Sequence, residues 1–261
     1  MNTLSIIGAG NMGYAIAQGL VKSGQYTKEQ IYLSTKDETA AANLSAEGYN
    51  VDDNIAIVKA SSLVILVVKP WQAEEVLAEI KPYITDEHIL ASCVTGLSSA
   101  KVFELIEKQI TFFRVMPNTG AMVGESMSCI SDHNADSAQK ELIKSIFSTL
   151  GLVLFIEEDK MAAGTAIAGC GIAFALRFIR AATECGVEIG VTAKDAAMMS
   201  AQIAKGAAEL ILQNESNPEV EIDKVTTPGG VTIAGLNEME HHGFSSSVIK
   251  GIKAAYDKAK A

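Results

Sequence analysis

The sequence is poor in cysteine and in positive charge, and both shortages exclude classes of function. Four cysteines are scattered over 261 residues, with no CxxC motif and no Cys/His cluster at metal-ligand spacing. This pattern predicts reduced thiols in a core rather than a disulfide framework or a metal site. Lysine and arginine number 21 against 31 aspartates and glutamates, which gives a formal net charge of −10. Because such a surface repels phosphate backbones, we expect no nucleic-acid partner.

Targeting and membrane-spanning patterns are also lacking. The N-terminal residues MNTLSIIGAG carry no basic region and run directly into an apolar strand, unlike a signal peptide. The most apolar stretch, from Met161 to Leu176, carries three glycines and is followed by Arg177. We expect this stretch to be too short to cross a bilayer and to form a helix that is buried on most sides. A soluble, cytoplasmic protein without a membrane partner is therefore expected.

Short apolar runs alternate with amphipathic segments through the first 160 residues. The run Leu63–Val68 is continuously apolar, as expected for a strand that is covered on both faces of a parallel sheet. Such alternation predicts an α/β fold, with a Rossmann-type doubly wound, mostly parallel sheet. The expected strands are Leu4–Gly8, Ile31–Ser34, Leu63–Val68, Ile89–Val94, Phe112–Met116, Ser126–Ile130 and Val153–Ile156, with helices at Asn11–Ser23, Glu38–Glu47, Trp71–Ile80 and Ala135–Leu150.

Strand signals vanish after Glu158, and the rest of the chain is rich in alanine, methionine, lysine and glutamate. We therefore place the α/β domain at residues 1–158 and an all-helical C-terminal domain at 159–261. Alanines and methionines lie on several faces of these helices, so we expect burial against a second copy in a homodimer. The expected helices are Asp159–Ala168, Ile172–Glu188, Ala193–Gln213, Thr232–His242 and Ser245–Lys260.

A glycine-rich motif follows the first strand and begins the first helix. Residues 8–13, Gly-Ala-Gly-Asn-Met-Gly, fit the pattern GxGxxG. In this context Gly8 permits a tight turn, Gly10 lets the backbone approach a pyrophosphate, and Gly13 lets the helix pack closely on the strand. The helix start at Asn11 and Met12 then offers amides and a partial positive charge to the diphosphate. The motif predicts a dinucleotide cofactor.

The tip of the second expected strand indicates which dinucleotide. NAD is normally selected there by an acidic residue that binds the ribose 2′-hydroxyl. Here the strand ends in Ser34, Thr35 and Lys36, whose hydroxyls and ammonium suit a 2′-phosphate. Asp37 follows, but it begins an alanine-rich run and is better explained as a helix N-cap. We expect NADPH, with NADH as the alternative.

Motifs in the second half of the chain make the prediction specific. The stretch Asp223–Leu236, which contains Thr-Thr-Pro-Gly-Gly-Val-Thr-Ile, closely resembles the signature of the pyrroline-5-carboxylate reductase family. The motifs Arg114–Thr119, Val68–Pro70 and Glu157–Asp159 resemble further motifs of that family. The resemblance extends over essentially the whole chain and implies hydride transfer from NAD(P)H to the imine carbon of 1-pyrroline-5-carboxylate, giving L-proline.

The resemblance also assigns roles to residues. It implies that amides around Thr227, Gly230 and Val231 hold the substrate carboxylate, while the Thr232 hydroxyl bonds the ring nitrogen. Remaining positions follow in the same way. On the cofactor side, the resemblance implies that Asn54 lies near the adenosine and that Thr95 and Gly96 lie near the nicotinamide. Val68, Lys69 and Pro70 then lie at the end of the fourth strand, beside the nicotinamide ribose. On the substrate side, Met116 and Asn118 form the floor of the active site, and Glu158 is a weaker candidate.

The chain departs from the family pattern at two places. Family members usually carry proline where this sequence has Gly120, and Gly-Ser-Gly-Pro-Ala where it has Gly169-Cys170-Gly171-Ile172-Ala173. These changes bear on the shape of the substrate pocket, so a reductase of another small imine stays open. A β-hydroxyacid-type reductase is a second alternative, although its expected catalytic lysine has only Lys160 as a candidate. A catalytically silent nucleotide-binding paralogue is the third alternative. For the assembly, a ring of dimers is an alternative to a single dimer.

Overall fold

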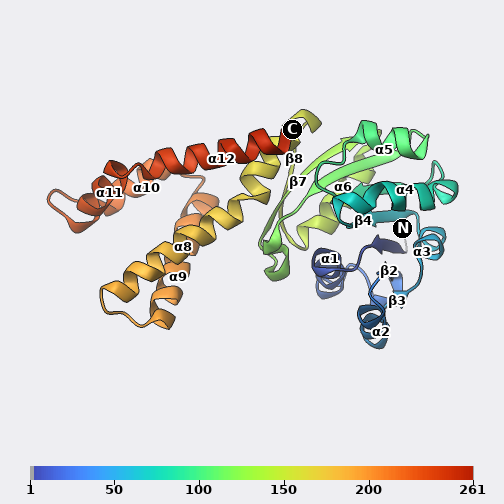
Figure 1. Cartoon of the computed structure of the whole chain (residues 1–261), viewed down its shortest axis with the longest axis horizontal. Helices are drawn as coiled ribbons and strands as arrows, with labels where there is room; N and C mark the ends of the chain where they lie inside the picture. Colours follow the sequence, from blue (N-terminus) through green and yellow to red (C-terminus); the bar gives the residue numbers. More distant parts are fainter. Residues whose placement is uncertain (1–2, 261) are drawn as a thin grey trace. The chain divides into compact units, whose positions relative to one another are not determined.

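The computed structural model describes residues 3–260, and its first part is built on one eight-stranded sheet. The sheet has the order β3-β2-β1-β4-β5-β6-β7-β8 (Figure 1). All neighbouring strands are parallel except β6 and β7, which are antiparallel. The strands are β1 Leu4–Ile7, β2 Ile31–Ser34, β3 Asn50–Val51, β4 Leu63–Leu66, β5 Ile89–Ser92, β6 Thr111–Met116, β7 Ser126–His133 and β8 Gly151–Phe155. The predicted fold class is confirmed.

Alternation along each strand gives the sheet two apolar faces, and helices cover both. On β4, Leu63 and Ile65 belong to one buried cluster, whereas Val64 and Leu66 belong to the other. All four side chains have no exposed surface, and full burial of such a side chain contributes about 1.5–3 kcal/mol. The first face is covered by α1 Asn11–Lys22, α2 Glu38–Ala46 and α6 Ser137–Ser148, and the second by α3 Asn54–Ala60, α4 Ala73–Ile80 and α5 Ser99–Ile106.

Strand order places a crevice above the middle of the sheet. The chain turns outward in opposite directions from β1 and from its neighbour β4. In doubly wound sheets, ligands bind at this point, beyond the carboxyl ends of the two strands. Short helical turns complete the connections: η1 Lys28–Gln30, η2 Pro70–Gln72, η3 Lys81–Tyr83, η4 Thr119–Val123 and η5 Glu158–Lys160.

The chain divides into two compact units: one comprises the chain up to Gly169 together with its end from Ala259, and the other comprises Cys170–Lys258. The first extends beyond Glu158 because α7 Met161–Gly164 and the π-helical turn η6 Thr165–Gly169 add Met161 and Ala168 to a cluster with Met116 and Cys129. The second consists of helices only: α8 Gly171–Glu188, α9 Ala193–Asn214, α10 Pro218–Val225, α11 Val231–His241 and α12 Phe244–Lys260, whose last residues lie outside this unit. Within it, α8 and α9 pack closely because Gly186 has no Cβ to meet Ala196.

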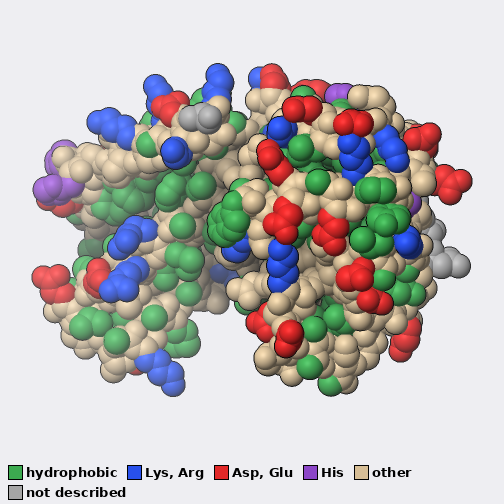
Figure 2. All heavy atoms as spheres, turned by 45° about the vertical axis from the view of Figure 1, so that its right-hand side comes forward, with side chains coloured by type: hydrophobic (Ala, Val, Ile, Leu, Met, Phe, Trp, Pro, Cys, Tyr) green, Lys and Arg blue, Asp and Glu red, His purple; other side chains and the backbone are tan. Residues whose placement is uncertain are grey.

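The helical unit exposes many large apolar side chains (Figure 2). Leu176 on α8 is 58% exposed, Ile203 on α9 is 60% exposed and Ile249 on α12 is 65% exposed. The stretch that we expected to be short and buried belongs to a helical segment of 31 residues, Glu158–Glu188, and only 17% of its most apolar window is buried. The expectation about its length and burial is therefore wrong for the single chain. By length and composition alone, this helix could cross a membrane, although interior helices of oligomers share that composition.

Candidate functional site

The glycine motif occupies the turn between β1 and α1, and each glycine has a distinct local reason. Gly8 adopts a φ of +100°, and a Cβ there would lie 2.6 Å from the Val67 carbonyl oxygen. A Cβ on Gly13 would collide with the Gly8 carbonyl. By contrast, a Cβ on Gly10 would meet no atom within 4 Å. The chain alone therefore does not require glycine at position 10, whereas a ligand that approaches the backbone would.

The loop is fixed by its neighbour β2, and it leaves the helix start open. The amides of Gly8 and Ala9 donate to the Ser34 carbonyl oxygen at 3.1 and 2.9 Å. Gly10 is the N-cap residue of α1 and provides no side-chain acceptor. The first amides of α1 therefore have no side-chain cap, which is the arrangement that binds a phosphate at a helix N-terminus.

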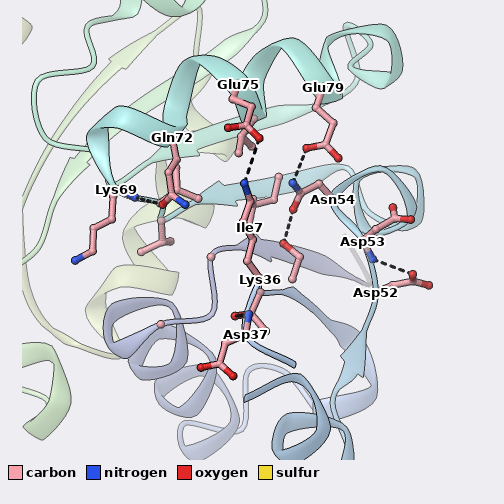
Figure 3. Close-up of a pocket in the computed structure, with 17 residues that line it drawn as sticks. Ile7, Lys36, Asp37, Asp52, Asp53, Asn54, Lys69, Gln72, Glu75 and Glu79 are labelled. Atoms are coloured by element: carbon pink, nitrogen blue, oxygen red, sulfur yellow. Dashed lines mark hydrogen bonds and ion pairs between the residues drawn. The ribbon is translucent and has the colours of Figure 1, made fainter. Parts of the chain in front are cut away.

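A pocket of about 590 Å³ lies beside this loop (Figure 3). It is bounded by the glycine loop, the end of β2, the start of α3, the residues after β4, and α4. The predicted cofactor residues that line it are Gly8, Gly10, Ser34, Thr35, Lys36, Asn54, Val68 and Lys69. The other predicted ones, Asn11, Met12, Gly13, Pro70, Thr95 and Gly96, lie outside its lining.

Two hydrogen bonds connect the tip of β2 to α4 across the pocket wall. The Ser34 hydroxyl donates to Asn54 Oδ1 at 2.6 Å, and Asn54 Nδ2 donates to Glu79 Oε2 at 2.7 Å. Asn54 is the first residue of α3, where the Asp53 carboxylate caps the helix by accepting from the Ala56 amide at 2.8 Å. The amide of Asn54 is thus oriented from both sides.

Sequence reasoning placed none of the acidic side chains in this pocket. Five carboxylates line it, from Asp37, Asp52, Asp53, Glu75 and Glu79. Asp37 is the N-cap that we expected, accepting from the Ala40 amide at 3.0 Å. Glu75 and Glu79 are four residues apart on α4, a spacing that puts both on one helix face. That spacing was the available signal, but only the fold shows that this face borders the glycine loop.

Glu158 lies against the start of α5 rather than in a pocket with the glycine loop. Its carboxylate accepts from the Ser99 amide at 2.8 Å and from the Ser99 hydroxyl. Arg114 Nη1 lies 3.5 Å from Glu158 Oε1, and Arg114 Nε is buried without a hydrogen-bond partner among residues 3–260. Burial opposes ionisation of Glu158, but Ser99 and then Arg114 hold its pKa below the usual range. These contacts explain Glu158 as a local anchor for the loop after β5.

Met116 and Asn118 are buried at the end of β6. Met116 packs with Cys129, Met161 and Ala168. Asn118 is fully engaged, since its Nδ2 donates to the Ala168 carbonyl at 3.0 Å and its Oδ1 accepts from the Gly120 amide at 2.8 Å. The Gly120 departure therefore has a local explanation, because proline at that position would lack the donor.

The predicted substrate residues lie in the turn before α11. Gly229 has a φ of +67°, and a Cβ on Gly230 would lie 2.5 Å from Thr227 Oγ1. Gly230 is the N-cap of α11 and offers no side-chain acceptor, so the amides of Val231 and Thr232 lack a side-chain cap. Val231 is 90% exposed. The Thr232 hydroxyl has no hydrogen-bond partner within residues 3–260. The turn thus offers the amides of Val231 and Thr232 as free donors in the unit taken alone, whereas the Gly230 amide already donates to the Thr227 carbonyl oxygen at 2.9 Å.

The cysteines and the possible metal ligands can be located within residues 3–260. All four cysteines are free, and burial raises the pKa of Cys93 to about 12. Cys93 is therefore a thiol at neutral pH and a poor nucleophile. In the described part of the chain, no group of three or more His, Cys, Asp or Glu residues is arranged to hold a metal ion.

Two family models match the chain. The model described as pyrroline-5-carboxylate reductase dimerisation matches residues 158–261. The model described as NADP oxidoreductase, coenzyme F420-dependent, matches residues 3–96. The two matches fall on the helical part and on the strands around the glycine loop.

Three relatives that match nearly all of this chain are named as pyrroline-5-carboxylate reductases. Pyrroline-5-carboxylate reductase 1 of Dictyostelium discoideum is 44% identical over 99% of this chain, although the chain spans only 49% of that relative. Pyrroline-5-carboxylate reductase 2 of the same organism is 40% identical, with 98% of this chain and 91% of the relative covered. The reductase of Methanosarcina acetivorans is 34% identical, with 98% and 96% covered.

Solved structures agree over the whole chain. Pyrroline carboxylate reductase of Plasmodium falciparum, solved with NADP bound, superposes with a TM-score of 0.89 at 29% identity, covering 99% of this chain and 97% of that one. The reductase of Coxiella burnetii gives a TM-score of 0.93 at 27% identity with the same coverage. With a glycine-loop pocket at the β1/β4 crevice and an open turn before α11, this chain belongs to the pyrroline-5-carboxylate reductase family.

Proposed function

We propose that the chain, an oxidoreductase of this family, reduces 1-pyrroline-5-carboxylate to L-proline with NADPH as the hydride donor. The observation that carries the proposal is the open turn before α11. Its glycines leave the amides of Val231 and Thr232 uncapped, inside the stretch that resembles the family signature. Uncapped amides at a helix start bind a carboxylate.

The pocket beside the glycine loop fits a dinucleotide. Its volume is about 590 Å³, and the missing Cβ of Gly10 leaves open space where the backbone would meet a pyrophosphate. Asn11, Met12 and Gly13 contribute through the α1 helix start. Val68, Lys69 and Pro70 follow β4 and would contact the nicotinamide ribose, while Thr95 and Gly96 follow β5 and would border the nicotinamide ring.

The chemistry asks little of the side chains. A protonated cyclic imine is electrophilic at carbon, and the chemistry that a bound NADPH would supply is a hydride for that carbon, with the C=N π electrons passing to nitrogen. The chain's part is to hold the carboxylate on the α11 amides, to orient the ring through the Thr232 hydroxyl, and to exclude water. In this scheme Met116 and Asn118 shape the floor, and Glu158 acts on the substrate side only through the loop that it anchors.

NADPH rather than NADH is proposed because of the tip of β2. Ser34 and Thr35 carry hydroxyls and Lys36 carries an ammonium, all in the pocket lining. These groups suit a 2′-phosphate. We further propose a cytoplasmic homodimer, in which the exposed apolar side chains of the helical unit cover one another.

The test is NADPH oxidation by the purified protein with and without pyrroline-5-carboxylate, followed by identification of the product. We expect proline to form stoichiometrically with NADP, and kcat/KM to be at least several-fold higher with NADPH than with NADH. A clear preference for NADH would refute the choice of cofactor alone. Absence of turnover with either cofactor would support a catalytically silent paralogue. Turnover of another imine or of a β-hydroxyacid would replace pyrroline-5-carboxylate as the assigned substrate.

A further inference from the structure

The pocket beside the glycine loop is acidic for a site that would accept an extra phosphate. Its lining contains two cations, Lys36 and Lys69, against five carboxylates. Lys36 Nζ lies 3.1 Å from Glu75 Oε1, so the cation closest in sequence to the tip of β2 is already paired. Figure 3 shows Lys69 directed away from that pair.

The ion pair joins opposite walls of the pocket. Lys36 follows β2, whereas Glu75 lies on α4, and Figure 3 shows the lysine reaching between them. The adenosine half of a dinucleotide binds beyond the end of β2 in folds of this class. The pair therefore stands where the 2′ substituent of the adenosine ribose would lie.

The neighbouring donors at this wall are engaged as well, but differently. Ser34 donates to Asn54, and Asn54 donates to Glu79. These two hydrogen bonds are short, and both involve Asn54, which α3 holds in place. The side chains of Lys36 and Glu75, in contrast, are 66% and 71% exposed. Exposed pairs contribute little and exchange partners readily, so Lys36 is the donor that a phosphate can recruit.

We propose that Glu75 limits the preference of this chain for NADPH by competing with the 2′-phosphate for Lys36. The inference rests on the proposed use of this pocket for the cofactor. A 2′-phosphate carries more charge than a carboxylate and takes Lys36 from Glu75. The freed Glu75 carboxylate then faces the phosphate at short range and repels it, which reduces the binding free energy that the 2′-phosphate contributes. NADH has only a hydroxyl there, so its binding leaves the pair intact.

The proposal predicts that Glu75→Gln tightens NADPH binding and leaves NADH binding unchanged. We expect the Kd for NADPH to fall about two- to five-fold, the size of an exposed charge interaction. The gain should shrink as salt rises, because exposed charges are screened. Glu74→Gln is the matched control: it removes the same charge from the same helix, but Glu74 pairs with Lys101 at 3.5 Å and lies outside the pocket lining. That variant should bind both nucleotides as the wild type does.

A double-mutant cycle with Lys36→Gln identifies the partner. On the Lys36→Gln background, Glu75→Gln should change the NADPH to NADH ratio by less than on the wild-type background. An unchanged ratio in Glu75→Gln, or equal changes in both affinities, would overturn the proposal. An equal loss of affinity for NADPH and NADH would mean that the Lys36–Glu75 pair covers the adenosine of either cofactor.

Both nucleotides are titrated in the absence of imine, so the result is independent of turnover. A wild-type protein that binds NADPH but does not reduce pyrroline-5-carboxylate would refute the proposed reaction and leave this measurement in place. A wild-type protein that binds neither nucleotide would refute the selectivity role together with the cofactor assignment.

Discussion

Glu158 accepts a hydrogen bond from the backbone amide of Ser99 at 2.8 Å, which ties η5 to the first residue of α5. The residues between β5 and α5 include Thr95 and Gly96, so this bond fixes the far end of the loop proposed to border the nicotinamide. Sequence alone suggested Glu158 as a weak substrate-side residue. The structure occupies its carboxylate with Ser99 and Arg114.

The first prediction concerns the stability that Glu158 provides. Its pKa is depressed in the folded state, so its contribution is present above the unfolded value, about 4.3, and is lost as pH falls through the folded value. Glu158→Gln should lower the free energy of unfolding at pH 7 by about 1–3 kcal/mol. The deficit relative to wild type should shrink as the pH falls below the unfolded value.

Urea unfolding at neutral and acid pH measures both effects. The control is Glu157→Gln, which changes the exposed neighbouring carboxylate and should stay within about 0.5 kcal/mol of wild type. Equal stability of wild type and Glu158→Gln at pH 7 would show that the Ser99 contacts contribute nothing net.

The second prediction separates the two halves of the proposed site. Thr232→Val keeps the branched shape and removes the hydroxyl, so kcat/KM for the imine should fall on the order of ten- to a hundred-fold, the cost of a hydrogen bond to a charged group. NADPH affinity should barely change. Steady-state kinetics and a cofactor titration give the two numbers.

Gly10→Val is the paired variant for the cofactor half. A Cβ at Gly10 meets nothing within 4 Å, so the fold should persist while the side chain intrudes where the pyrophosphate approaches. We expect NADPH affinity to fall directly. Wild-type turnover of the imine by Thr232→Val would leave the turn before α11 as a purely structural element.

The third prediction is self-association through the helical unit. Light scattering should show at least a dimer at micromolar concentration, because side chains such as Ile203, 60% exposed, need a partner surface. Ile203→Lys should shift the protein towards monomer. The control Asp86→Lys, an exposed change in the nucleotide-binding unit, should not. A monomeric wild type at these concentrations contradicts the dimer.

The fourth prediction tests the departure at Gly120. A Cβ there would collide with the Glu125 carbonyl, and proline would also remove the amide that Asn118 accepts from. Gly120→Pro should therefore lower the free energy of unfolding by about 1–3 kcal/mol or more. Thermal and urea unfolding provide the measurement.

Thr119→Pro is its matched control. Thr119 is exposed and is the first residue of η4, and Asn118 before it is already extended, with φ −125° and ψ 176°. Proline is tolerated at such a position. If Gly120→Pro unfolded no more easily than Thr119→Pro, the explanation from the Asn118 contact would be wrong.

Elements whose signal is local were predictable. The strand β2 was predicted at Ile31–Ser34, its observed bounds, and β4 was anticipated because its run is continuously apolar. The short helices α3, α5 and α10 were not anticipated, because seven or eight residues span barely two turns and give no clear periodicity. The equally short α4 was anticipated because the helical turn η2 precedes it and lengthens the amphipathic pattern. Two-residue β3 gives none at all.

The same distinction holds in the pocket. The glycine loop follows from contacts within the first β-α unit, so the sequence alone indicated it. Glu75 and Glu79 reach the pocket only because β4 lies beside β1 and carries α4 to that side. Likewise, apolar helices look alike whether the chain itself or a second copy covers them. The expected burial of the stretch beginning at Met161 failed for that reason.

The position of Trp71 makes the protein its own optical reporter. It is the single tryptophan of the chain, is 79% exposed, and stands in η2 between Pro70 and Gln72, next to the pocket wall. All indole fluorescence therefore comes from one place. Reduced nicotinamide absorbs where indole emits, so cofactor arrival in the pocket dims that emission by energy transfer. The titrations of the Glu75 and Lys36 variants with NADPH can accordingly be followed without any label or mutation added for detection.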